Sequence, residues 1–155
     1  MIAFDKLVLC QFIKIHGEFG IGLITVPVIL VGYAYGPSFG FFFGLLILPF
    51  VAGSLEFITW LVSPPLGETA WLPFLPSFSS FIDGIVAFVS GYLRQSLPLV
   101  LVVGIGSSIK CFLNIIKHKA TSSDPIKFGW IGEIFFNTFL VFFFSNFFQT
   151  ILSLV

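Results

Sequence analysis

Long uncharged segments constrain the fold of this chain more than any other feature. From Phe19 to Leu55, 37 consecutive residues carry no formal charge, and the last 22 residues, Ile134 to Val155, also carry none. Only 9% of the residues are charged, whereas a soluble domain carries roughly 25%. Because so few charges cannot cover a soluble surface, we predict an all-α, polytopic transmembrane helical bundle: a single membrane domain over residues 1–155, without a soluble domain.

Breaks between the apolar segments predict five membrane spans. A membrane helix needs about 20 apolar residues, so the run from Phe19 to Leu55 is too long for one span. The sequence Gly36-Pro37-Ser38 lies near its middle and predicts a tight turn between two helices. Applied along the chain, the same criterion predicts spans at about 19–35, 39–62, 77–93, 96–116 and 128–150.

The distribution of Lys and Arg predicts the orientation, since positive residues concentrate on the cytoplasmic side. Five spans with the N-terminus inside leave only Arg94 outside, whereas the following residues lie inside: Lys6, Lys14, Lys117, Lys119 and Lys127. The runner-up topology has four spans, with 77–93 at the interface, and distributes these charges equally between the two sides. We therefore expect a prokaryotic cytoplasmic (inner) membrane protein with its N-terminus inside.

Four ionisable residues fall within the predicted spans: Glu56, Asp83, Lys110 and Glu133. Each lies five or six residues from the predicted cytoplasmic end of its span, a depth of about 8–9 Å. A charge within the membrane is costly, so it should face the bundle or water. Three interpretations remain open: positions in the headgroup region, a structural ion pair between Lys110 and one acid, or a pathway for ions or protons.

The fifth predicted span carries a polar stripe among many phenylalanines. Glu133, Asn137, Ser145 and Gln149 are separated by multiples of four, so one straight helix would place them near one face. Such a stripe predicts hydrogen bonds between helices or, in a symmetric oligomer, the lining of a pore.

Small residues also recur at a spacing of four. Gly40 and Gly44 lie in the second predicted span, and Gly104 and Ser108 lie in the fourth. In an apolar helix this spacing allows the backbones of two helices to approach closely. We therefore predict tight helix packing at these four positions.

The segment after the fourth span is a candidate partner surface. Its charged residues are Lys117, His118, Lys119, Asp124 and Lys127. A solvated loop that follows the positive-inside rule explains the same charges without a partner. Both interpretations place the segment on the cytoplasmic side.

The sequence indicates a class of protein but no activity. It contains no HExxH, GxSxG or Cys–His arrangement, so we predict a protein that is not an enzyme and has no cofactor or metal site. The absence of a long basic run argues against nucleic-acid binding. We expect a small multi-pass membrane subunit that homo-oligomerises in the lipid bilayer and anchors or senses for a larger assembly, by binding a cytosolic or membrane protein partner through its cytoplasmic face. The alternative is an ion or proton channel, or a small transporter, that uses the four intramembrane charges.

Overall fold

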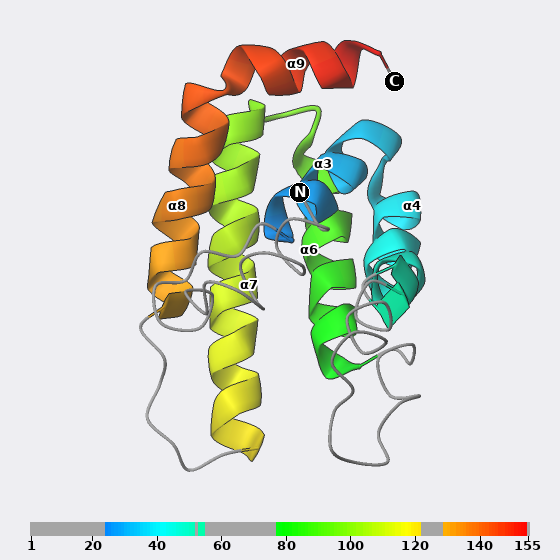
Figure 1. Cartoon of the computed structure of the whole chain (residues 1–155), viewed down its shortest axis with the longest axis vertical. Helices are drawn as coiled ribbons and strands as arrows, with labels where there is room; N and C mark the ends of the chain where they lie inside the picture. The colour runs from blue at the N-terminus through cyan, green and yellow to red at the C-terminus, as the bar shows by residue number, and fades with distance from the viewer. Residues whose placement is uncertain (1–23, 52, 55–76, 122–128, 155) are drawn as a thin grey trace.

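The computed structural model describes residues 24–51, 53–54, 77–121 and 129–154, which are helical apart from short turns. The elements are α3 (Thr25–Tyr35), α4 (Pro37–Phe42), the π-helical segment η2 (Phe43–Ile47), α6 (Phe78–Leu93), α7 (Leu99–Thr121), α8 (Gly129–Phe143) and α9 (Ser145–Ser153). In Figure 1, α6, α7 and α8 stand beside one another, α3 and α4 lie next to α6, and α9 crosses one end of the bundle. The predicted all-α fold is confirmed for the described residues.

Within this part of the chain, one helix is long and apolar enough to cross a membrane by itself. This helix is α7, whose 23 residues extend for about 34 Å. The helices α8 and α9 meet the same criteria only as a pair, with a bend of 73° between them. The helices α3 and α6 are shorter, with 11 and 16 residues. The described residues therefore do not show the five predicted spans, parts of which lie outside them.

The predicted break at Gly36-Pro37 is present. The helix α3 ends at Tyr35, Gly36 has a φ of 96°, and Pro37 occupies the first turn of α4. Positive φ favours glycine, and proline suits the start of a helix because the amide there has no helical partner. The Arg94 guanidinium donates a hydrogen bond of 3.0 Å to the carbonyl oxygen of Ala34, and so satisfies one acceptor at the end of α3.

Glycines bring α3, α4 and η2 into backbone contact with α6. A Cβ on Gly32 would lie 2.0 Å from the Ala87 carbonyl oxygen, and one on Gly40 would lie 3.0 Å from the same atom. A Cβ on Gly44 would lie 2.6 Å from the Asp83 carbonyl carbon. These distances leave no space for a side chain, so the helices approach as closely as small residues allow. Gly40 and Gly44 thus lie at a tight helix contact.

The second predicted pair of small residues behaves differently. A Cβ on Gly104 would meet Thr138 Oγ1 at 3.5 Å, which is an ordinary contact. Ser108 is exposed and donates a hydrogen bond of 2.8 Å to the Gly104 carbonyl oxygen within α7. Among the described helices, these two positions therefore do not lie at a close backbone contact, and tight packing there stays a prediction.

The helix α7 also extends beyond its sequence-based boundary. The sequence predicts an end at residue 116, but α7 continues to Thr121, with His118 and Lys119 in its last turn. Positive side chains are favourable there because they interact with the carbonyl end of the helix dipole. Residues 107–121 contain neither proline nor glycine, so nothing local stops the helix at 116.

The sequence predicts one helix over 128–150, but the structure bends at Phe144, whose φ and ψ are −101° and 26°. The helix α9 packs Phe148, which is 3% exposed, against the bundle. Four polar residues of α9 lie on its exposed side: Asn146, Gln149, Thr150 and Ser153. The bend therefore buries Phe148 and keeps the polar side of α9 outward, whereas Phe147 and Ile151 of the same helix remain exposed.

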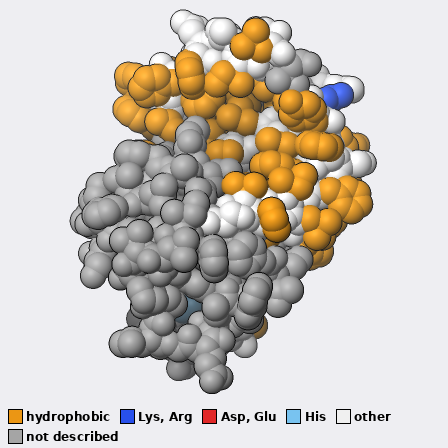
Figure 2. Space-filling view, turned by 45° about the vertical axis from the view of Figure 1, so that its right-hand side comes forward, with side chains coloured by type: hydrophobic (Ala, Val, Ile, Leu, Met, Phe, Trp, Pro, Cys, Tyr) orange, Lys and Arg blue, Asp and Glu red, His pale blue; other side chains and the backbone are white. Residues whose placement is uncertain are grey.

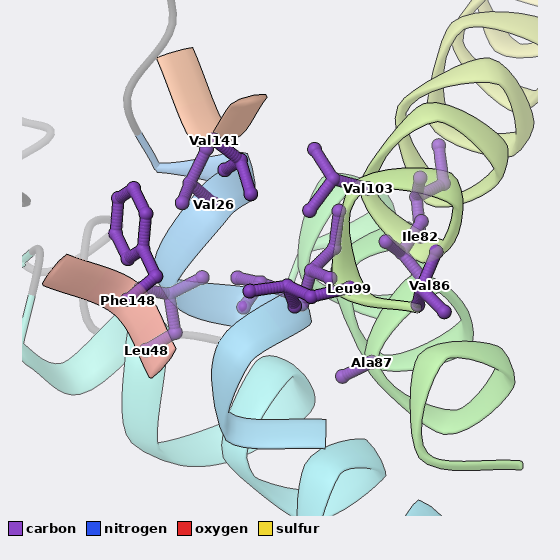
Figure 3. Close-up of a cluster of buried hydrophobic side chains, with 12 residues drawn as sticks. Val26, Leu48, Ile82, Val86, Ala87, Leu99, Val103, Val141 and Phe148 are labelled. Atoms are coloured by element: carbon purple, nitrogen blue, oxygen red, sulfur yellow. The ribbon is translucent and has the colours of Figure 1, made fainter. Parts of the chain in front are cut away.

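The interior and the exterior of the bundle are both apolar. The buried cluster in Figure 3 comprises Val26, Val28, Ile29, Leu48, Ile82, Val86, Ala87, Leu99, Val102, Val103, Val141 and Phe148. Hydrophobic side chains also cover most of the described surface visible in Figure 2. On α8, Phe135 and Phe143 are 72% and 64% exposed. A large apolar surface of this kind indicates a site that contacts lipid or protein.

Candidate functional site

Three charged side chains from three helices meet inside the bundle. The ammonium of Lys110 on α7 lies 3.0 Å from Asp83 Oδ1 on α6 and 3.8 Å from Glu133 Oε1 on α8. These residues belong to the predicted intramembrane charged layer, and the structure brings them together. Glu56, the fourth member of that layer, lies outside the described residues.

A fourth helix contributes a hydroxyl group to this cluster. Lys110 Nζ donates a hydrogen bond of 2.8 Å to Thr25 Oγ1 on α3, and the Thr25 hydroxyl donates to Glu133 Oε1. Thr25 is completely buried. The hydroxyl therefore links the ammonium to the more distant carboxylate. We refer to Thr25, Asp83, Lys110 and Glu133 as the charged cluster.

Two carboxylates in the charged cluster share one ammonium. The side chains of Asp83, Lys110 and Glu133 are only 12–16% exposed. With all three groups ionised, they carry a net charge of −1 in a poorly solvated position. The contact between Lys110 and Asp83 Oδ1 is ionic, and this oxygen has no hydrogen-bond partner in the protein. Among the described residues, the charged cluster therefore contains one more acidic than basic side chain.

The level of the charged cluster within the bundle follows from contacts nearer the end of α7. Lys117 Nζ donates a hydrogen bond of 2.6 Å to Ser79 Oγ in the first turn of α6. Lys110 lies seven residues before Lys117, about 10 Å along α7. Because α7 ends at Thr121 and not at 116, Lys110 lies about 16 Å from that helix end.

The polar stripe predicted for the last span does not form one face. Asn137 on α8 is completely buried, whereas Gln149 on α9 is exposed and Ser145 is partly buried. The cause is the 73° bend between α8 and α9, which gives the two halves of the stripe different directions. Asn137 therefore belongs to the interior together with Glu133, and Gln149 does not.

The predicted partner surface is only partly available for a partner. Lys117 is bound to Ser79, and the His118 ring packs edge-on against Trp130 with ring centroids 5.4 Å apart. Lys119 is exposed at the end of α7. The remaining members of this surface, Asp124 and Lys127, lie outside the described residues.

Sequence reasoning missed two buried polar residues near the charged cluster. They are Thr25, described above, and Ser107 on α7, which is 3% exposed. Each is a hydroxyl residue within an apolar segment, and this is the only sign of a buried polar site in the sequence. The sign is weak, because serine and threonine hydroxyls commonly donate a hydrogen bond to a carbonyl of their own helix. In the described ranges, no group of three His, Cys, Asp or Glu side chains is placed to hold a metal ion.

No protein family, curated protein or solved structure matches this chain.

Proposed function

We propose that this chain is a small integral membrane protein that moves protons or monovalent cations by way of the charged cluster. The observation that carries this proposal is that Asp83 and Glu133 share Lys110 inside the bundle. In membrane segments, buried ionisable residues commonly mark ion pathways and proton relays. The proposal includes the five-span arrangement and the orientation with the N-terminus inside a prokaryotic cytoplasmic membrane.

The charges themselves support a transport role over a purely structural one. A structural ion pair needs one acid and one base, and it is most favourable when the charges cancel. Here a second carboxylate adds a negative charge that a mobile proton or cation neutralises. Binding and release of that species would switch the cluster between neutral and negative states, which is the elementary step of carrying a positive charge.

The surroundings of the charged cluster support membrane placement. Lys110 lies on α7, which is long and apolar enough to cross a bilayer. From Leu99 to Lys117 this helix extends for about 27 Å, close to the thickness of about 30 Å of a hydrocarbon core. Exposed phenylalanines on α8 provide the apolar exterior that lipid requires.

Flux measurements on reconstituted protein test this proposal. The purified full chain is incorporated into vesicles that contain a pH-sensitive dye, and a potassium diffusion potential drives positive charge inward. Parallel vesicles report uptake of radioactive sodium or rubidium. We expect flux above that of empty vesicles for the wild type, and flux at the empty-vesicle level for Glu133→Gln and Asp83→Asn.

Matched controls separate loss of transport from loss of structure. Glu133→Gln keeps an oxygen that accepts from Thr25, so the contact between α3 and α8 is retained. Lys119→Gln removes a charge of an exposed residue away from the charged cluster and should leave the flux unchanged. A correctly folded wild type without flux, or cluster variants that conduct like the wild type, would refute the proposal.

A second candidate function is a membrane subunit that homo-oligomerises and binds a partner at its cytoplasmic end. The observation that favours it is the projecting basic end of α7, which extends past the start of α8 in Figure 1 and presents the exposed Lys119. Exposed phenylalanines on α8 provide an apolar face for a second copy of the chain.

Mass measurement in a gentle detergent tests this second function. A subunit should be isolated as an oligomer with a stoichiometric protein partner, and Lys119→Glu should release that partner. We choose Lys119 and not Lys117 because Lys117 also holds α6 through Ser79, so its loss would disturb the bundle. A monomer that is isolated alone from its native membrane would contradict the subunit role.

A further inference from the structure

In the described part of the chain, two uncharged polar side chains of the interior have no hydrogen-bond partner. Asn137 on α8 is completely buried, and neither Oδ1 nor Nδ2 of its amide is paired. Ser107 on α7 is 3% exposed, and its Oγ is also unpaired. An unpaired buried polar group costs about 1–3 kcal/mol, so two such residues in one small bundle require a partner.

The register of α7 and α8 places these two residues near the same level. Gly104 faces Thr138, and Lys110 lies close to Glu133 further along the pair. Ser107 lies midway between Gly104 and Lys110 on α7. It is therefore level with a point on α8 that is less than one turn from Asn137. Both residues are therefore about one helical turn from the charged cluster, on the side away from Lys117.

The chemistry of the two side chains selects water as their partner. Asn137 Nδ2 needs an acceptor, whereas Asn137 Oδ1 and Ser107 Oγ accept a donor. A metal cation would coordinate the oxygens but leave the amide donor unpaired. A water molecule both donates and accepts, and buried water typically makes about three hydrogen bonds of this kind.

We infer that Ser107 and Asn137 bind water that is continuous with the charged cluster, and that the species moved by the protein is the proton. Asp83 Oδ1, which is ion-paired with Lys110 but has no hydrogen-bond partner among the described residues, gives this water an acceptor within the charged cluster. A proton then passes from the protonated carboxyl group of Asp83 or Glu133 to the bound water: the O–H bond of the acid breaks as a new O–H bond forms on the water, which leaves a carboxylate and a protonated water. The reverse transfer restores the acid. This inference depends on the proposed function for its transport step, whereas the water site can be tested separately.

A layer of valines limits the hydrated region on the side away from the charged cluster. Val103 lies one turn from Ser107 on α7, and Val141 lies one turn from Asn137 on α8. Both valines are completely buried and belong to the core cluster in Figure 3. Their side chains offer water no hydrogen bond, so the wet site ends where this layer begins.

Hydrogen–deuterium exchange of a thiol tests for water at Ser107. In a background with Cys10→Ser and Cys111→Ala, the variant Ser107→Cys places a thiol at the proposed site with a minimal change in size. Its S–H stretching band in the infrared disappears as deuterium from the solvent exchanges with the proton. The matched control is Val103→Cys in the same background, on the same helix and equally buried. We expect exchange at least about tenfold faster at position 107 than at position 103, because exchange of a buried proton requires contact with water.

Proton and sodium uptake into vesicles completes the test. We expect wild-type vesicles to take up protons but no radioactive sodium, and Asn137→Leu to reduce proton uptake to the level of empty vesicles. Equal exchange at positions 107 and 103 would overturn the water site even if the wild type transports ions. Fast exchange at position 107 in a protein without flux would support the water site and refute the proposed function. Sodium uptake equal to proton uptake would refute the assignment of the proton.

Discussion

Gly32→Ala tests the close backbone approach between α3 and α6. The new Cβ would lie 2.0 Å from the Ala87 carbonyl oxygen and 2.8 Å from its carbonyl carbon. Carbon and oxygen in contact prefer a separation of about 3.3 Å or more, so α3 and α6 would have to move apart by about 1.3 Å. The obstacle is the backbone of a helix, which cannot rotate away as a side chain can.

The cost of this movement follows from the contacts that it weakens. A gap of 0.5–1 Å already removes about a quarter to a half of the dispersion energy of each contact along the interface. Overpacking of a core typically costs about 1–3 kcal/mol. Because the clash is with backbone and is severe, we expect a loss near the upper end, about 3 kcal/mol of the free energy of unfolding.

The assay is reversible unfolding in mixed micelles, with circular dichroism followed as the fraction of denaturing detergent increases. Gly104→Ala is the matched control, because its Cβ would meet Thr138 at 3.5 Å without a clash. Adding Ala87→Gly should not rescue Gly32→Ala, since the clash involves the backbone oxygen and not the Ala87 side chain. Equal stability of the two glycine variants, or rescue by Ala87→Gly, would refute this account of the interface.

Three further predictions concern stability and use the same unfolding assay. Lys110→Met should cost about 3–5 kcal/mol, because it leaves two largely buried carboxylates without their cation; a neutral effect would contradict the shared ion pair. Phe148→Ala should cost about 3–5 kcal/mol by detaching α9, whereas the exposed Phe147→Ala should change stability by less than about 0.5 kcal/mol. Ser77→Ala removes the side chain that accepts a hydrogen bond at the start of α6 and should cost about 1 kcal/mol, so unchanged stability would contradict its capping role.

The sequence predicts those features of the fold that depend on neighbouring residues. The turn between α3 and α4 follows from Gly36-Pro37, because these residue types restrict the backbone locally. The helical class follows from long apolar segments with few charges. Both signals are contained within a few consecutive residues, so no knowledge of tertiary contacts is needed.

Features that depend on contacts between distant segments cannot be predicted from neighbouring residues alone. The glycines Gly32 and Gly44 pack on α6, about 40 to 55 residues further along the chain, and the spacing of four does not name this partner. The bend at Phe144 involves neither proline nor glycine. The only sign of the bend in the sequence is that polar and apolar pairs alternate along α9 with helical spacing. The surrounding phenylalanines obscure this pattern.

The candidate site shows the same division. The cost of burying charge predicts that Asp83, Lys110 and Glu133 face the interior, but sequence cannot give the distances among them. Thr25 and Ser107 carry no charge, so their part in the interior depends on which helices become neighbours. The pairing of Lys117 with Ser79 is likewise a tertiary contact, and it removes a residue from the predicted partner surface.

The bend at Phe144 has a practical consequence for experiments that ask on which side of a membrane each helix end lies. Because α6, α7 and α8 run alternately up and down, the end of α6 and the end of α8 emerge at the same face of the bundle, and α9 lies across that face (Figure 1). In the proposed membrane arrangement, α9 therefore adds no further crossing. A reporter fused to the C-terminal end of this chain and a membrane-impermeant label on Arg94→Cys would report the same compartment, and a label on Lys119→Cys would report the opposite one.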